Sequence, residues 1–404
     1  MADPVEPRMA IPDDAELGAL TSDHPQSLHT EKLALGIEEL APGLVSLRRM
    51  GDIQALTRSH DVRQFGGATM GFLGDGASEI VGLSGKHVAI PLELDGGIHT
   101  KWRKILDPVF TPKKMAVLEP RVRARAEELI DAFVDRGEVD AYVEWCEPLP
   151  SSIFLSIMGI PRSELAAFLE FKNTILGGAY DGSVTPGARN AAYDACDAWF
   201  AAEFDRRDAS GEYGDDLIGW LMNTEIDGRR VNRDELHGIC NLLMIAGLDT
   251  VAASLSCILA RLAGHPDERA ALLADPSKWP AAIEEMMRFE SPVTQGFRHV
   301  VADVELPSGT LPAGTGAIVW WAAANVDPAA FDDPLTVHLD RQPNPHICFA
   351  SGWHRCLGSH LARMELRAAL DVWHARIPDY RIADATELVY SVNPRAPHHL
   401  PLVW

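Results

Sequence analysis

The chain has 404 residues, of which 36 are lysine or arginine and 58 are aspartate or glutamate, so its formal net charge at pH 7 is -22. This excess of negative charge repels phosphates and argues against binding to nucleic acid or to anionic membranes. The N-terminal segment is too charged and proline-rich for a signal peptide, and no uninterrupted apolar run approaches the roughly 18 residues of a spanning helix. We therefore expect a soluble, cytoplasmic protein.

Cysteine usage and chain length bound the architecture further. No two cysteines form a CxxC pair, and their wide spacing predicts neither a disulfide framework nor a zinc site. The length exceeds that of a usual single domain, but the sequence contains no linker-like stretch, internal repeat or low-complexity block. The cysteines are Cys146, Cys196, Cys240, Cys257, Cys348 and Cys356.

The N-terminal region gives weak local signals. Residues 1–40 show no clear periodicity, and we expect an irregular arm. Residues 44–53 predict a short strand that leads into a helix at residues 53–58. Residues 64–98 are rich in glycine and poor in periodicity, which predicts a long loop, and such loops are often functional.

After this loop, the sequence HTKWRKIL predicts a helix that begins at His99. His99 and Arg103 are four residues apart and therefore share one face of the helix. A solvated surface is the ordinary interpretation of such a pair. A planar guanidinium is also well suited to carboxylates, because it can donate two parallel hydrogen bonds.

Residues 101–125 are basic although the chain as a whole is acidic, and only Asp107 and Glu119 oppose the positive charges there. A solvated helix face would explain the cluster. The functional alternative is a docking surface for an acidic protein partner, because charge complementarity steers encounter. The basic residues are Lys101, Arg103, Lys104, Lys113, Lys114, Arg121, Arg123 and Arg125.

The middle of the chain is mostly helical in pattern, and its composition assigns no function. Glycine and proline interrupt the helical patterns. Helices are predicted at residues 121–136, 151–158, 164–176 and 186–208.

The longest helix is predicted at residues 233–263. Asn232 can cap its N-terminus, with Glu235 at the third helical position, and Gly264 can end it. At 1.5 Å per residue such a helix spans roughly 45 Å. Residues 239–262 are apolar on almost every face, so the helix should be central and buried.

Three residues inside this helix depart from the local rules. Gly247 costs about 1 kcal/mol relative to alanine in a helix interior, and a buried Asp249 costs several kcal/mol unless it is paired. Thr250 follows directly. Functional sites are where such departures are expected. The ordinary alternative is a threonine that bonds back to its own helix and an aspartate in a salt bridge.

Further along, residues 280–289 predict a helix that carries Glu285 and Arg288 on one face, where they can pair. By itself such a pair ordinarily lies on a solvated surface, and a role in folding and not in catalysis is what the family resemblance given below implies. Residues 297–301 and 318–321 then predict strands.

Residues 349–358 read FASGWHRCLG and hold one cysteine between two glycines. The helical pattern that follows places Cys356 just before a helix N-terminus, where unpaired backbone N–H groups favour a thiolate over a thiol. A lone cysteine is most often a small buried hydrophobe. A thiolate on a glycine-lined turn can also be the axial ligand of a haem iron, because glycine lets the backbone approach a flat macrocycle closely.

This stretch resembles the haem-binding loop of the cytochrome P-450 superfamily. The sequence matches the family pattern at Phe349, Gly352, His354, Cys356 and Gly358, and it departs from the pattern at Ala350, where the family usually has glycine. The resemblance implies a single, mainly α domain over residues 1–404 with small β-sheets. In that fold a long central helix lies over the haem, and the cysteine loop lies beneath it.

The resemblance also implies roles for particular residues. Cys356 would ligate the iron, and Asp249 and Thr250 would relay protons beside a space for dioxygen at Gly247. His99, Arg103, Arg298 and His354 would bind the haem propionates, and Phe349 would contact the haem. Residues Met70, Phe72, Ala246, Val293 and Gly296 would line the substrate pocket.

The implied function is that of a haem-thiolate monooxygenase, which inserts one oxygen atom from dioxygen into an apolar organic substrate. Its cofactor would be haem b. Electrons would come from NAD(P)H through a ferredoxin and a ferredoxin reductase, because no reductase module is recognisable in the chain. The ferredoxin would dock near Lys101, Lys104, Lys113 and Lys114. Two alternatives stay open, namely a peroxide-driven peroxygenase and a non-catalytic haem-binding or sensor protein.

Overall fold

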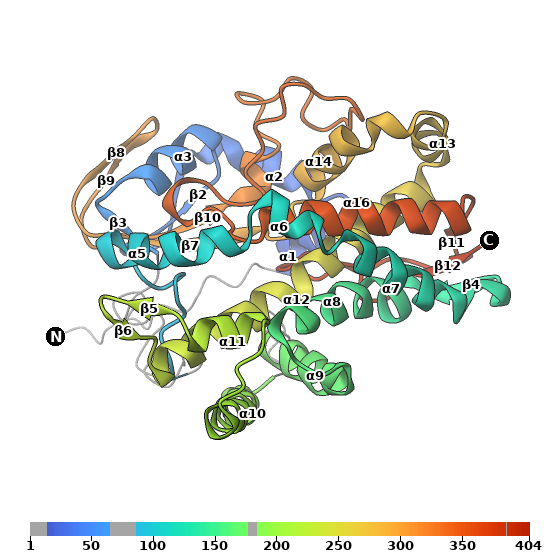
Figure 1. Cartoon of the computed structure of the whole chain (residues 1–404). Coiled ribbons are helices and arrows are strands. Elements are labelled where there is room, and N and C mark those ends of the chain that lie inside the picture. The colour runs from blue at the N-terminus through green and yellow to red at the C-terminus, as the bar shows by residue number, and fades with distance from the viewer. Residues whose placement is uncertain (1–13, 65–85, 177–183, 385) are drawn as a thin grey trace. The chain divides into compact units, whose positions relative to one another are not determined.

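The computed structural model describes residues 14–64, 86–176, 184–384 and 386–404 (Figure 1). The chain forms two compact units. The first unit contains residues 64–109 and 150–249, and the second contains residues 10–63, 110–149 and 250–404. The predicted single domain over the whole chain stays a prediction. The predicted fold class is confirmed, because helices predominate and the sheets are small.

The first unit is built almost entirely from helices. Helices α9 and α10 pack side by side, and rings of Phe168, Trp199 and Phe200 meet between them at centroid distances of 5.2–6.0 Å. The strands of this unit form a short hairpin. Its elements are α5 (Gly96–Leu106), most of α8 (Pro148–Met158), α9 (Leu165–Leu176), α10 (Pro186–Ser210), α11 (Leu217–Met222), β5 (Glu225–Ile226) and β6 (Arg229–Arg230).

Helix α12 (Arg233–Gly264) begins in the first unit and ends in the second. Its predicted capping box is confirmed: the backbone N–H of Glu235 donates to Asn232 Oδ1, and the N–H of Asn232 donates to Glu235 Oε2, both at 2.9 Å. Among the described helices, α12 alone is long and apolar enough to cross a membrane, but 83% of its most apolar stretch is buried in the protein. That burial is typical of a core helix.

The second unit contains a five-stranded sheet of order β1-β2-β10-β7-β3. Strand β10 runs parallel to β2, with Ile318 opposite Ser46, and antiparallel to β7, with Ile318 opposite Phe297. Buried side chains that include Leu47 and Val319 form the adjoining hydrophobic core. The strands are β1 (Ile37–Ala41), β2 (Leu44–Leu47), β3 (Val62–Arg63), β7 (Gln295–Val300) and β10 (Gly316–Trp320).

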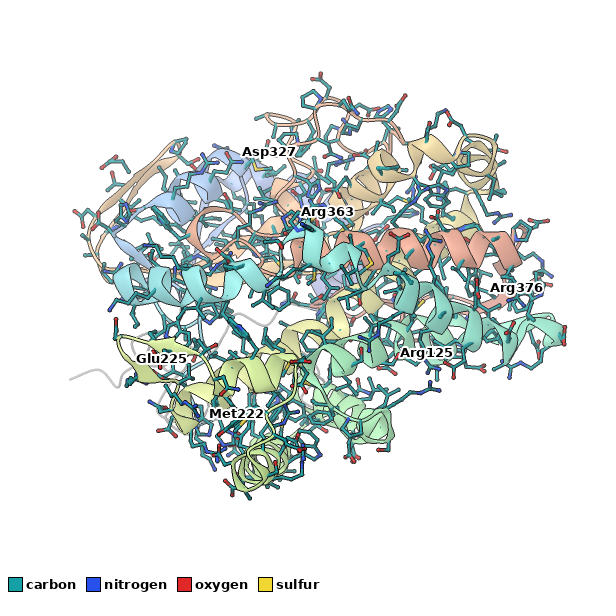
Figure 2. All side chains as sticks on the ribbon, in the orientation of Figure 1. Arg125, Met222, Glu225, Asp327, Arg363 and Arg376 are labelled. Carbon is teal, nitrogen blue, oxygen red and sulfur yellow. The ribbon has the colours of Figure 1, made fainter. Side chains whose placement is uncertain are left out.

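Helices and smaller sheets complete the second unit, in which α16 packs along α7 (Figure 1). Asp327, which is labelled in Figure 2, accepts a hydrogen bond of 2.8 Å from the N–H of Met50 at the start of α3. The remaining elements are α1 (Asp14–Leu20), α2 (Gln26–Lys32), α3 (Met50–Arg58), α6 (Pro112–Ala116), α7 (Glu119–Asp131), α13 (Pro266–Ala274), α14 (Trp279–Glu290), α15 (Trp321–Ala324), α16 (Ser359–Arg376), β4 (Glu138–Asp140), β8 (Val304–Leu306), β9 (Gly309–Leu311), β11 (Arg381–Ile382) and β12 (Pro401–Val403).

The N-terminal arm differs from its predicted irregular form, because it contains α1, α2 and β1. Isolated helices of this length are not stable in water, so their order comes from tertiary contacts. The buried Gln26 donates its side-chain N–H to the carbonyl of Phe289 at 3.0 Å, and the ring of His29 lies 5.7 Å from that of Trp320. These contacts join residues that are far apart in the sequence, so the local pattern of residues 1–40 could not predict them.

Candidate functional site

The cysteine loop has a backbone that only a few residue types tolerate. Ala350 has a φ of 61° and Gly352 a φ of 73°, both in the left-handed region. A Cβ on Gly352 would also collide with the carbonyl of Thr57, so glycine is required there on two counts. At Ala350, where glycine is usual in the related pattern, the chain accepts a strained alanine. The N–H of Cys356 donates to the carbonyl of Phe349 at 2.9 Å and closes the loop.

Cys356 differs from the other cysteines in exposure. Its thiol is exposed, whereas the other five cysteines are buried. Gly358 caps the N-terminus of α16, so Cys356 lies two residues before the cap, as predicted. The helix dipole favours a thiolate at such a position. In contrast, burial raises the pKa of the Cys348 thiol well above its ordinary value. Cys356 is therefore the cysteine that can bind an external group.

Glu284 of α14 binds Arg363 of α16 and His346, which lies three residues before the cysteine loop, and the sequence did not predict these contacts. Arg363 of α16, labelled in Figure 2, donates two hydrogen bonds of 2.6 and 2.7 Å to Glu284, and His346 lies 2.9 Å from the same carboxylate. Burial alone would raise the pKa of Glu284, but His346 and Arg363 lower it to about 2. The Arg363 guanidinium also lies 4.3 Å from the ring centre of Phe349. The only sequence signal was the position of Arg363 on the helix after Cys356.

Glu285 and Arg288 form a fully buried ion pair, with hydrogen bonds of 2.7 and 2.8 Å. Arg288 also donates to the carbonyls of Asn325 at 2.7 Å and Pro334 at 2.9 Å. Arg341 donates a third side-chain bond to Glu285 at 2.9 Å. The pair thus ties α14 to the segment that leads toward the cysteine loop, which supports a role in folding.

In the middle of α12, Asp249 is buried and forms an ion pair with Lys172 of α9. The Lys172 ammonium, whose side chain is 1% exposed, donates to Asp249 Oδ1 at 2.8 Å. The ordinary alternative for this residue, an aspartate in a salt bridge, is therefore what the structure shows, and the charge of Asp249 is compensated. By contrast, Ala246 is exposed and Gly247 and Thr250 are half-buried. Their spacing places them together on one face, so this largely buried helix has one accessible band of small residues.

Gly247 has a second structural reason for being glycine. A Cβ there would approach the ring of Phe154 on α8 to 2.7 Å, closer than real contacts allow. In the same region, Ser151 Oγ donates to the carbonyl of Leu248 at 3.1 Å. Gly247 thus permits close packing of α8 on α12, and the predicted space for dioxygen stays a prediction.

The predicted propionate-binding residues lie on ordered elements. His99 is buried on α5, which begins at Gly96, and Arg103 on the same helix donates to Asp107 at 2.7 Å. Arg298 is buried in β7, where it donates to the carbonyl of Phe297 at 2.6 Å and lies 5.4 Å from the ring centre of Trp321. The first unit holds His99, Arg103, Gly247 and Asp249, and the second holds Thr250, Arg298, His354 and Cys356.

Two of the predicted pocket residues, Met70 and Phe72, lie outside the described residues. Val293 packs against the hydrophobic core beside the five-stranded sheet. Gly296 of β7 lies against Trp321, whose ring nitrogen would be 3.2 Å from an added Cβ. Both are half-buried, which leaves part of each accessible.

The basic segment is less uniform than its sequence suggests. Lys101 forms an ion pair with Asp227 at 2.8 Å, and Arg123 contacts both Glu119 and Asp371 at 2.9 Å. Lys104 on α5 and the α6 lysines Lys113 and Lys114 are exposed, and within the described part of the chain no ion pair engages them. These three lysines are the better candidates for contact with an acidic partner.

The residues present fit a haem group. Cys356 supplies the soft sulfur donor that iron in such sites requires, and its thiol is exposed just before a helix N-terminus. The loop that holds it contains Gly352, where the Cβ of any other residue would collide with the backbone of Thr57. Small residues give α12 an accessible band within a buried helix. His99, Arg103 and Arg298 offer the nitrogen donors that propionates need.

Comparisons with known proteins bear on the same site. The family model described as Cytochrome P450 matches residues 279–372. The chain is 34% identical over 317 residues to cytochrome P450 107B1 of Saccharopolyspora erythraea, covering 77% of this chain and 76% of that protein. It is 33% identical over 298 residues to the steroid C26-monooxygenase of Mycolicibacterium smegmatis, covering 72% and 73% respectively. A crystal structure of the myxobacterial cytochrome P450 CYP267B1 with myristic acid is 27% identical, with a TM-score of 0.85 and coverage of 97% and 99%.

Proposed function

The chain belongs to the cytochrome P450 family and is an oxidoreductase that incorporates oxygen, and from this premise we propose that it uses dioxygen to hydroxylate an apolar, lipid-like or steroid-like substrate in the cytoplasm. Its similarity to the steroid C26-monooxygenase and to a methyl-branched lipid omega-hydroxylase of Mycobacterium tuberculosis, 32% identical over 323 residues, supports this substrate class. The myristic acid in the CYP267B1 structure supports it as well.

The single observation that carries the proposal is the exposed Cys356 thiol ahead of α16. Haem, which the family implies, supplies dioxygen activation when it is bound. Cys356 is the residue that would hold it, with His99, Arg103, Arg298 and His354 on its propionates. The Phe349–Cys356 backbone bond closes the loop, and Arg363, which pairs with Glu284, lies against the ring of Phe349, so the backbone that carries Cys356 is held in place.

Proton delivery is assigned to Asp249 and Thr250. The Thr250 hydroxyl would hold a proton at the accessible band of α12, while the buried Asp249 carboxylate would resupply it. Lys172 binds Asp249 Oδ1 at 2.8 Å and compensates the charge of this buried carboxylate.

The reaction is tested by a screen of fatty acids, steroids and macrolides for the Soret shift that substrate causes. Each compound that shifts the band is then incubated either with NAD(P)H, ferredoxin and ferredoxin reductase or with hydrogen peroxide alone. Hydroxylated product in the first mixture supports the monooxygenase. Product with peroxide alone supports the peroxygenase, and no product with either supports the sensor.

Replacing Thr250 with alanine should uncouple electron use from product formation. The change removes a hydroxyl and little volume, so folding and haem binding should persist. A positioned proton donor contributes about 10²–10⁴-fold, of which ordered water can replace part, so we expect product per NAD(P)H to fall about tenfold or more. The measurement compares product, NAD(P)H consumption and released hydrogen peroxide.

Ser254 provides the matched control for Thr250, because it lies one turn further along α12 and its hydroxyl already donates to the carbonyl of Thr250 at 2.8 Å. Ser254→Ala should keep wild-type coupling. Asp249→Asn should instead slow turnover, since the relay loses its ionisable member. Wild-type coupling in Thr250→Ala would show that this threonine is only a helix residue.

Electron transfer from an acidic ferredoxin should slow as salt concentration rises. Exposed charges are screened beyond about 8 Å at physiological ionic strength, so a docking surface that uses Lys104, Lys113 and Lys114 weakens in salt. Lys113→Glu and Lys114→Glu should lower the association rate without changing haem content. Arg381→Glu, an exposed charge on β11, should not. A rate that is independent of salt and of the α6 lysines would contradict this docking surface.

A further inference from the structure

Two histidines and an aspartate meet in the first unit, outside the residues assigned to catalysis. Among the described residues, His87, Asp197 and His237 are the one group of three whose ligand atoms all lie within 4.8 Å of one another. His87 precedes α5, Asp197 lies on α10 and His237 lies near the start of α12. Three segments that are distant in sequence therefore converge on one point.

The distances between these donors suit a metal ion better than an ordinary hydrogen-bonded cluster. His87 Nε2 lies 3.3 Å from Asp197 Oδ2, and His237 Nδ1 lies 3.3 Å from Asp197 Oδ1. Ligands of a tetrahedral zinc ion, each at about 2.0–2.1 Å, lie about 3.3 Å from one another. The two imidazole rings are stacked, with centroids 4.7 Å apart and planes 10° apart, so both rings flank the same carboxylate.

Two of the donor atoms are buried without a conventional partner. Asp197 and His237 are only 6% and 8% exposed. Within the described part of the chain, Asp197 Oδ2 and His237 Nδ1 make no hydrogen bond of ordinary geometry. Buried polar atoms in native proteins nearly always have partners, so this arrangement indicates a missing one. A cation between the three side chains would satisfy both atoms at once.

The surrounding residues hold the donors in place, as a metal site requires. Asn241 donates to Asp197 Oδ1 at 2.7 Å and orients the carboxylate. His87 Nδ1 lies 3.5 Å from Asp234, so its second nitrogen faces a carboxylate, the arrangement that orients many metal-binding histidines. Gly238 lets the His87 segment lie directly against α12, because a Cβ there would collide with the carbonyl of Val88.

The charges also favour a cation. Besides Asp197, the carboxylate of Asp234 lies 3.5 Å from His87, and Lys86, 3.6 Å from Asp197 and 3.2 Å from Asp194, is the cation beside the cluster.

We propose that His87, Asp197 and His237 bind one divalent transition-metal cation of the zinc class. Two imidazoles and one carboxylate are ligands that suit zinc, and water would complete the coordination. The ion would link the segment before α5 to α10 and α12, because each of these three elements supplies one ligand. It would stabilise the first unit without taking part in oxygen chemistry.

The test is zinc binding to the haem-loaded full chain, measured by equilibrium dialysis with elemental analysis. Wild type should retain one zinc ion per chain at micromolar zinc, and zinc should raise its melting temperature, since a ligand bound to the native state stabilises it. Asp197→Asn and His237→Gln should weaken binding by about 100-fold or more, because even the loss of an outer partner costs 10–100-fold. Both variants should lose the zinc-dependent rise in melting temperature.

His24 offers a matched control, because it is an exposed histidine 3.5 Å from Asp23 and far less enclosed. His24→Ala should bind zinc as wild type does. If a substitution at Asp197 or His237 prevents folding, judged by haem content, His87→Gln at the more accessible edge of the cluster replaces it. Zinc binding of equal strength in wild type and His87→Gln, or no binding at micromolar zinc in wild type, would overturn the proposal.

Discussion

Replacing Cys356 with alanine should abolish thiolate ligation of the haem and, with it, monooxygenase activity. The wild-type protein, reduced and exposed to carbon monoxide, should show the red-shifted Soret band of a thiolate ligand. Cys356→Ala should lose this band, because among the six cysteines only the Cys356 thiol is exposed. Its position two residues before the cap of α16 also gives it the electrostatic support that a thiolate needs.

Cys348 is the matched control, since it lies on the same segment but is buried beside His346, with Sγ 2.9 Å from the ring Nδ1. Burial raises its pKa, which disfavours the ligating form. Cys348→Ala should therefore keep the red-shifted band and most of the activity. The assignment of the ligand is wrong if Cys356→Ala retains the band and Cys348→Ala loses it.

Replacing Arg288 with alanine should remove a large part of the stability of the second unit. The change leaves Glu285 charged in a site that is 0% exposed, and it frees carbonyls that Arg288 now satisfies. Removing one partner of a buried ion pair costs about 3–5 kcal/mol, against a total free energy of unfolding of about 5–15 kcal/mol for a domain. We expect little soluble, haem-loaded protein and a much lower midpoint of urea unfolding.

The pair of Arg206 and Glu203 provides the comparison, because its arginine is exposed and Glu203 keeps Arg207 as a second partner. Arg206 is 61% exposed, and exposed pairs contribute about 0–1 kcal/mol, so Arg206→Ala should leave the midpoint almost unchanged. Arg288→Lys should not restore wild-type stability, because one ammonium cannot replace the planar fork that binds Glu285 and two carbonyls. Unfolding of Arg288→Ala within 1 kcal/mol of wild type would contradict the folding role.

Much of the helical framework was predictable because its signals are local. The apolar run of α12, with Asn232 and Glu235 at its start, predicted residues 233–263, and the structure has Arg233–Gly264. The helices predicted after Ser359 and at residues 280–289 are likewise present, as α16 and α14. Side chains three or four residues apart share a helix face, so periodicity and caps encode such elements without reference to the rest of the chain.

The cysteine loop could also be predicted from the sequence, because its glycines, histidine and cysteine lie within ten residues of one another. Its backbone needs a positive φ at Gly352, and that demand is visible as a residue type. The sequence by itself therefore determined the ligand candidate, the long central helix and the family resemblance.

Only the tertiary structure decided which isolated polar residues meet. Asp249 is neutralised by Lys172, which lies 77 residues earlier, and Glu284 meets Arg363 79 residues later. The ordering of α2 by Phe289 and Trp320, and the convergence of His87, Asp197 and His237, arise in the same way. A single charged residue carries no periodic signal, and its partner is set by how helices pack. That packing depends on the apolar surfaces of several elements at once, so it cannot be read from any one segment.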